Sequence, residues 1–126
     1  MNNITLSDGE WKLMNELWEN HPCSLAQLVN AFENDTRWSK STIFVMLKRL
    51  IAKNAVKVDT SGRVQLYTPI IKKEETTVRE TRSFLSRVYG GSIGLMVSSL
   101  AGQSSLSENE IAELRSILDE MEKKER

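Results

Sequence analysis

The order of its segments constrains this chain more than any single motif does. Three short amphipathic segments come first, and two alternating runs around a glycine-containing turn follow at once. Val56 and Val58 alternate with polar residues before the turn, and Val64, Leu66 and Thr68 do so after it. Alternation on both sides of such a turn is typical of a β-hairpin. Three helices and a hairpin in this order predict a winged helix-turn-helix, so we expect a mainly α fold with one small β-hairpin.

Serine residues mark the predicted helix starts. Ser7 and Glu10 stand three residues apart, as do Ser24 and Gln27, and each pair has the pattern of a capping box. In this motif each residue of the pair accepts a hydrogen bond from the backbone amide of the other. Ser39 is a good N-cap for the third helix, which we expect over residues 39–53. Ile43, Leu47 and Leu50 recur there at helical spacing and predict its buried stripe.

Charge is unevenly distributed, although 17 basic and 17 acidic residues balance over the whole chain. Residues 37–73 include nine basic residues and one acidic residue, a local charge of +8. A field of this strength attracts phosphate in spite of the neutral total. A basic face that is merely solvated is the alternative, and charge alone does not decide between the two.

The outer face of the third helix combines cations, hydroxyls and two apolar side chains. Its start offers free amides to a phosphate, and Arg49 can neutralise a phosphate or read a guanine. Phe44 and Val45 either touch thymine methyl groups or fill a gap against the hairpin. Arg63, at the hairpin tip, is expected to hold the DNA backbone rather than read a base. The predicted DNA-binding residues are Ser39, Lys40, Ser41, Thr42, Phe44, Val45, Lys48, Arg49 and Arg63.

The second half of the chain is predicted to be helical and to pair with a second copy. Helices are expected from Lys72 to Tyr89, where Gly90 and Gly91 follow, then over 93–100, and again after a third capping box at Ser107. About 50 residues with narrow apolar stripes can hardly enclose a core alone, so we expect a homodimer; packing within the chain is the alternative. The predicted dimerisation residues are Leu85, Val88, Tyr89, Ile93, Met96, Val97, Leu100, Ile111, Leu114, Leu118 and Met121.

Several function classes are disfavoured by what the sequence lacks. One cysteine, Cys23, and one histidine, His21, allow no internal disulfide and no metal cage, and Cys23 is expected to be a small buried residue. We find no glycine-rich phosphate loop and no catalytic set, so we expect neither an enzyme nor a cofactor. No apolar run approaches the ~20 residues of a membrane span, and the first residues lack a secretion signal, so we expect a cytoplasmic protein.

Several motifs together resemble one known family. They are Ser7-Asp8-Gly9-Glu10-Trp11, Leu17-Trp18, Trp38-Ser39-Lys40-Ser41-Thr42-Ile43, Leu47-Lys48-Arg49-Leu50, Tyr67-Thr68-Pro69, Ser83-Phe84-Leu85 and Tyr89-Gly90-Gly91-Ser92. In this order and spacing they are similar to the penicillinase repressors (BlaI and MecI), a family that includes the copper-responsive CopY repressors. The resemblance extends from about Ile4 to Met121.

The resemblance implies a dimeric repressor of antibiotic-resistance or related genes that binds a palindromic operator of TACA/TGTA type. It makes residues 39–53 the recognition helix, residues 1–72 the DNA-binding domain and residues 73–126 the dimerisation domain. The DNA contacts that it implies on the recognition helix are Lys40, Ser41, Thr42, Val45 and Arg49. It also implies cleavage between Ser99 and Leu100, triggered by a membrane-bound sensor protease. The four-cysteine cluster of the copper branch is missing, which excludes copper sensing by that route. A winged helix that docks proteins without touching DNA is the alternative function, and it does not require the +8 stretch.

Overall fold

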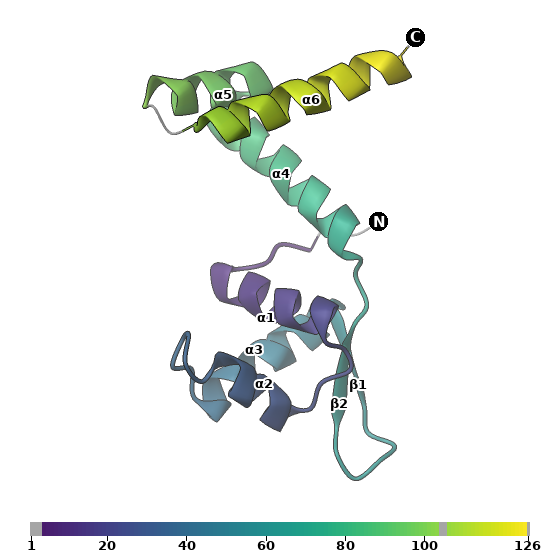
Figure 1. Ribbon diagram of the computed structural model, residues 1–126. Helices are drawn as coiled ribbons and strands as arrows, with labels where there is room; N and C mark the ends of the chain where they lie inside the picture. Colours follow the sequence, from purple (N-terminus) through teal and green to yellow (C-terminus); the bar gives the residue numbers. More distant parts are fainter. Residues whose placement is uncertain (1–3, 104–105, 126) are drawn as a thin grey trace. The chain divides into compact units, whose positions relative to one another are not determined.

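The computed structural model describes residues 4–103 and 106–125 and divides into two compact units, Met1–Glu80 and Thr81–Arg126 (Figure 1). Each unit is described by itself, and one helix, α4, runs from the first unit into the second. The elements in chain order are α1 (Asp8–Glu19), α2 (Leu25–Phe32), α3 (Lys40–Ala52), β1 (Val56–Asp59), β2 (Leu66–Pro69), α4 (Lys73–Tyr89), α5 (Ile93–Gly102) and α6 (Glu108–Lys124).

Serine caps begin the three helices of the first unit, as predicted. Both capping boxes are complete, with Ser7 and Glu10 at α1 and Ser24 and Gln27 at α2. The Ser39 hydroxyl accepts the amide of Thr42 at 3.1 Å and caps α3. These bonds satisfy backbone amides that the first turn of a helix leaves without a partner.

The third predicted capping box forms only in part. At the start of α6 the Ser107 hydroxyl accepts the Glu110 amide at 3.1 Å, as a cap should. The Glu110 carboxylate, however, accepts from the same hydroxyl at 3.2 Å rather than from the Ser107 backbone. The hydroxyl competes successfully for the carboxylate because it lies close to it and can rotate.

The core of the first unit is made by the inner faces of its helices. The stripes of α1, α2 and α3 converge, and the hairpin closes the side of the core with Val56 and Tyr67. Trp18 lies at the edge of this core, where its indole N–H donates to the Ile71 carbonyl at 2.9 Å. The largest fully buried apolar side chains are Leu13, Met14, Leu17, Leu28, Ile43, Leu47, Leu50 and Val56.

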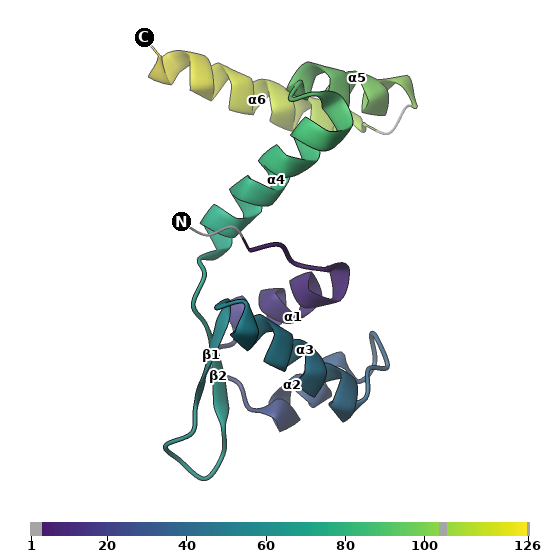
Figure 2. The same ribbon diagram turned by 180° about the vertical axis from the view of Figure 1, so that it is seen from behind.

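The hairpin is shorter than the alternating sequence predicts. Its register pairs Val56 with Pro69 and Asp59 with Leu66, so Val64 lies in the connecting loop and is exposed. Inclusion of Val64 in the second strand was therefore wrong. The Asp59 carboxylate accepts the backbone N–H of Ser61 at 2.9 Å and its hydroxyl at 2.6 Å. This local turn leads the chain out of the sheet directly after Asp59. The loop projects away from the three helices (Figures 1 and 2).

A short bridge links the segment between α1 and α2 to the hairpin. Cys23 donates its amide to the Tyr67 carbonyl at 3.0 Å and accepts the Tyr67 amide at 2.8 Å. The Cys23 side chain is buried, as predicted, and its thiol donates to the Asn20 carbonyl at 2.6 Å. Burial, helped by the charge of Glu16, raises the pKa of the Cys23 thiol, which keeps it in the neutral, unreactive form.

The second unit buries little of its own apolar surface. Within residues 81–103 and 106–125, Leu85 is the single buried hydrophobic residue. Gly90 and Gly91 adopt φ values of 57° and 88° and end α4, and the Gly91 amide donates to the Leu85 carbonyl at 2.9 Å. Among the described residues of both units, no helix combines the length and the apolar character that crossing a bilayer requires.

Candidate nucleic-acid interface

Packing of α3 determines which of its side chains face solvent. The helix contacts α1, α2 and β1, and it buries Ile43, Met46, Leu47 and Leu50 against them. In Figure 2 it lies in front of α1. The side chains on the other faces of α3 remain exposed because no described element of this unit covers them.

All the predicted DNA-binding residues are exposed in the structure. Those from residues 39 to 49 lie together on α3 and its cap, whereas Arg63 lies on a different element, the loop that follows β1. Phe44 is 37% exposed and Val45 is 48% exposed, which is unusual for apolar residues on a helix that packs so closely on its inner side.

The basic side chains of this face have no acidic partners. Among the described residues, Lys40, Lys48, Arg49 and Arg63 form no ion pair. The Lys48 ammonium instead lies over the Phe44 ring, 5.2 Å from its centroid. Unpaired cations on one exposed face give it a positive potential that a phosphate backbone can neutralise.

Lys53 does not belong to this positive face, although it was counted in the basic stretch. Its ammonium bonds the Glu10 carboxylate at 2.6 Å and the Thr5 carbonyl at 2.9 Å. Glu10 is 1% exposed, and burial alone would raise its pKa. The hydrogen bonds from Lys53 and Ser7 outweigh burial, so the pKa of Glu10 lies below its ordinary value. The pair holds the end of α3 against the start of α1.

The hydroxyls at the start of α3 are linked to one another. The Ser39 and Thr42 oxygens lie 3.0 Å apart, and Ser39 also accepts the Thr42 amide. This orients the Thr42 side chain while leaving one of its lone pairs and its methyl group available. The arrangement suits contact with a base edge or a phosphate oxygen.

Phe44 borders an open hollow that the sequence did not predict. The hollow has a volume of about 250 Å³ and is lined by Leu25, Lys40, Ser41 and Phe44. None of the lining residues belongs to the hairpin, so this surface of Phe44 does not fill a gap against it. Leu25 was not among the predicted site residues, because it lies on α2 and not on the predicted recognition helix.

The predicted dimerisation residues differ in how far the chain covers them. Leu85 is 8% exposed, so the chain's own atoms already bury it, and Tyr89, Met96 and Val97 are half-buried. The sequence missed three further exposed apolar residues of this unit, Phe84, Leu95 and Ile117. Of the predicted set, those that remain exposed are Val88, Ile93, Leu100, Ile111, Leu114, Leu118 and Met121.

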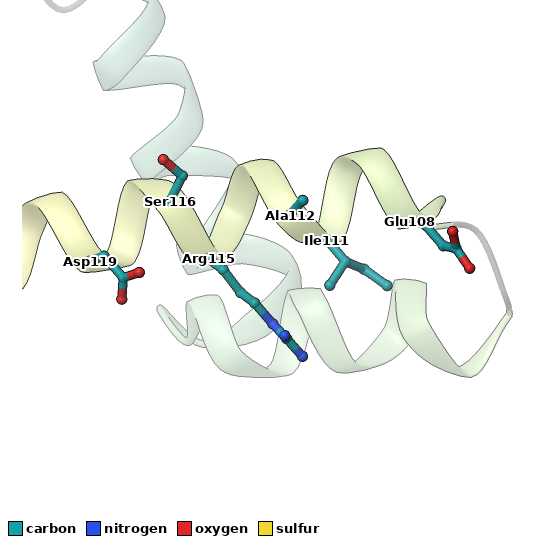
Figure 3. Close-up of a pocket in the computed structure, with 6 residues that line it drawn as sticks. All are labelled: Glu108, Ile111, Ala112, Arg115, Ser116 and Asp119. Carbon is teal, nitrogen blue, oxygen red and sulfur yellow. The ribbon is translucent and has the colours of Figure 1, made fainter.

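A second open hollow, of about 430 Å³, runs along one side of α6. Figure 3 shows that the residues lining it all come from this one helix. Because it lacks an opposite wall, it is a helix face rather than an enclosed pocket. Its lining mixes both charge signs with small and apolar side chains: Glu108, Ile111, Ala112, Arg115, Ser116 and Asp119.

The predicted cleavage bond lies inside α5. The Ser99 hydroxyl donates to the Met96 carbonyl at 2.8 Å and lies 2.8 Å from the Tyr89 hydroxyl. Both Ser99 and Leu100 are exposed. The bond is therefore accessible at the surface but held in helical conformation.

Comparison with known proteins identifies the family. A family model described as penicillinase repressor matches residues 6–120. The chain belongs to the penicillinase repressor family. The penicillinase repressor of Bacillus licheniformis is 35% identical over 115 residues, which are 91% of this chain and 90% of that protein. The penicillinase repressor of Staphylococcus aureus is 30% identical over 121 residues, 96% of each chain.

Among solved structures, the chain resembles the monomeric form of Bacillus licheniformis BlaI in complex with the blaP half-operator. The TM-score is 0.51 at 32% sequence identity, and the match covers 57% of this chain and 88% of that chain. The predicted family and the predicted winged-helix fold are thereby confirmed. The penicillinase repressor match also extends well beyond α4, so the family likeness includes the second unit.

Proposed function

We propose that this chain is a DNA-binding transcriptional repressor that reads its operator with the outer face of α3. The observation that carries this proposal is a set of basic side chains that form no ion pair among the described residues. They are Lys40, Lys48 and Arg49 on that face, with Arg63 in the hairpin loop. The operator complex of the related BlaI supports it. Residues of α3 would enter the major groove, and Arg63 would hold the backbone beside it.

The proposed repressor acts as a homodimer on a palindrome of two TACA/TGTA-type half-sites. The exposed apolar residues of α5 and α6 support this, since a surface of that kind marks an interface. A two-fold pair of recognition helices matches a palindrome, and joining two half-sites raises affinity without new contacts. The dimer would act in the cytoplasm on genes of β-lactam resistance or related function, by occupying DNA rather than by catalysis.

Relief of repression is proposed to follow cleavage between Ser99 and Leu100 by a membrane-bound sensor protease. The cut would separate α6 from the rest of the chain and remove its apolar residues from the dimer surface. The helical conformation of α5 implies that the bond unwinds before a protease can take it as an extended strand. An intact chain isolated from cells exposed to a β-lactam would contradict this step.

Binding to a labelled TACA/TGTA palindrome, measured over a range of salt concentrations, tests the proposed function. We expect log affinity to fall linearly with log salt, with a slope near −0.9 for each phosphate neutralised. A scrambled duplex of equal length should show weaker binding with a smaller slope. Absence of salt-dependent binding to either duplex would favour a protein-docking winged helix instead.

A further inference from the structure

The hollow beside Phe44 differs in character from the rest of the α3 surface. Leu25 of α2 and Lys40, Ser41 and Phe44 of α3 line it, and the surface that they present to it is mostly apolar. Phosphate oxygens bind to cations and amides, so the phosphate groups of DNA gain nothing from an apolar lining. An apolar patch at this position requires an apolar partner if it is to contribute to binding.

The ring of Phe44 contacts a cation of its own helix. The Lys48 ammonium lies over it at 5.2 Å from the ring centroid, which is a favourable cation–π distance. The attraction to this ring would therefore still act on Lys48 when a phosphate draws its ammonium outward. Two of the lining residues, Lys40 and Ser41, lie in the first turn of α3, the part of a recognition helix that meets base edges.

The major groove of DNA offers one apolar group of suitable size, the 5-methyl group of thymine. The other groups that define the major-groove pattern are hydrogen-bond donors and acceptors, which an apolar lining would leave without partners. Val45 is equally apolar and exposed but does not line the hollow, so it provides a matched comparison on the same helix.

We infer that the hollow between Leu25 and Phe44 is a specificity subsite that receives a thymine 5-methyl group of the operator. This rests on the proposed function, because the hollow meets a base only if α3 enters the major groove. The subsite makes Phe44 a specificity residue, distinct from the cations that supply sequence-independent affinity.

Replacement of thymine by deoxyuridine tests the assignment, because it removes the methyl group and keeps every hydrogen bond. The full chain first selects its preferred duplex from a random-sequence pool, and each thymine of that duplex is then replaced in turn. We expect one thymine in each half-site at which replacement weakens binding about fourfold, the effect of burying one methyl-sized group. Fluorescence anisotropy measures each affinity.

Variants at residue 44 connect that thymine to the hollow. Phe44→Ala is expected to bring the thymine-to-deoxyuridine ratio at this position to about one, and Phe44→Leu to keep most of it. Because Val45 does not line the hollow, Val45→Ala should keep the ratio at this position whatever it does to the overall affinity. Should Phe44→Ala fail to fold, Phe44→Gln gives the same test with a larger side chain than alanine that ends in a polar amide in place of the ring, and circular dichroism reports folding.

The outcomes separate this inference from the proposed function. If no sequence is enriched from the pool, DNA reading fails and the subsite fails with it. If a duplex is selected but no thymine responds to replacement, or if the response survives in Phe44→Ala, the subsite is overturned and the repressor assignment stands. The subsite is supported if the response is lost in Phe44→Ala, or in Phe44→Gln should the alanine variant not fold, and is kept in Val45→Ala.

Discussion

Arg49 and Lys53 stand four residues apart on the same stretch of chain, yet their surroundings give them opposite tasks. Lys53 meets a buried carboxylate and a carbonyl oxygen, so its charge is used inside the protein. Arg49 is exposed and forms no ion pair among the described residues, so its charge is available to a ligand. Charge counting along a sequence treats both alike, and only the fold separates them.

Replacing Arg49 tests whether it reads a base or holds a phosphate. Arg49→Ala should weaken binding to the selected operator by about 1–3 kcal/mol if the guanidinium bonds a guanine edge. Affinity for random-sequence duplex should then fall much less, and both values follow from anisotropy titrations. An equal loss on both duplexes would assign Arg49 to the backbone instead.

Replacing Glu10 tests the pair that holds α3 against α1. Glu10→Gln keeps a residue able to complete the capping box, as Gln27 does at α2, but removes the charge that binds Lys53. We expect a loss of about 1–3 kcal/mol of unfolding free energy at pH 7, the value of a hydrogen bond to a charged group. Urea titration measures it.

The same variant predicts a pH dependence with a definite sign. The pKa of Glu10 in the folded protein lies below its ordinary value of 4.5, so its contribution is complete above that value. It is lost as pH falls through the lowered pKa. The stability difference between the wild type and Glu10→Gln should therefore stay constant from pH 7 to about 5 and shrink at more acid pH. A difference that grows on acidification would contradict the assigned charge state.

At the scale of elements, the sequence predicts what is local and misses what is distant. The capping serines lie three residues from their partners, so the starts of α1, α2 and α3 were readable from spacing alone. The bridge between Cys23 and Tyr67 joins residues far apart in the chain, and no spacing signals it. The start of β2 was placed too early, at Val64, because the turn in which Asp59 binds Ser61 leads the chain out of the sheet and overrides the alternation.

The candidate interface also combines local features that the sequence predicts with distant contacts that it misses. Helical periodicity placed the cations and hydroxyls of α3 on its outer face, since four buried residues define the inner one. The contribution of Leu25 to the hollow was missed, because it depends on how α2 lies beside α3. The diversion of Lys53 depends on a partner 43 residues away. Such contacts arise only when the helices pack.

Alanine substitutions at two glycines test the turn between α4 and α5, because they are expected to change stability in opposite directions. Gly91 has a φ of 88° with open space around it, so Gly91→Ala should cost about 1–2 kcal/mol through backbone strain alone. Gly94 lies inside α5, and a Cβ there meets only the Ser92 hydroxyl at 3.7 Å. Gly94→Ala should therefore stabilise by roughly 0.5–1 kcal/mol. Thermal unfolding followed by circular dichroism compares the two, and equal signs would contradict the turn geometry.

At the scale of the whole molecule, the two units distribute their apolar residues in opposite ways. The first unit buries its stripes around a continuous core. The second leaves ten large hydrophobic residues exposed over residues 81–103 and 106–125. A stretch of chain that exposes so much apolar surface is incomplete in water, which is why we propose that a second copy covers it.

Leu118→Glu tests this pairing without removing any of the chain. Because Leu118 is exposed, the variant should fold, but a charge on the predicted seam should weaken self-association at least about tenfold. Ser116→Glu adds the same charge on another side of α6 and is expected to leave association unchanged. Sedimentation equilibrium measures both, and operator affinity should fall with the first variant alone. An undisturbed dimer in Leu118→Glu would place the interface elsewhere.

The pairing of Cys23 with Tyr67 has a mechanical consequence for the DNA-binding unit. Because the connection between α1 and α2 is bonded directly to β2, movement of the hairpin relative to the helices would have to break these two hydrogen bonds. A duplex would thus meet two contact elements, α3 and the hairpin, at a separation that these hydrogen bonds help to fix. Operators that fit would have to adapt their own groove width to that separation, and stiff sequences with the wrong width would be rejected even where every contacted base is correct.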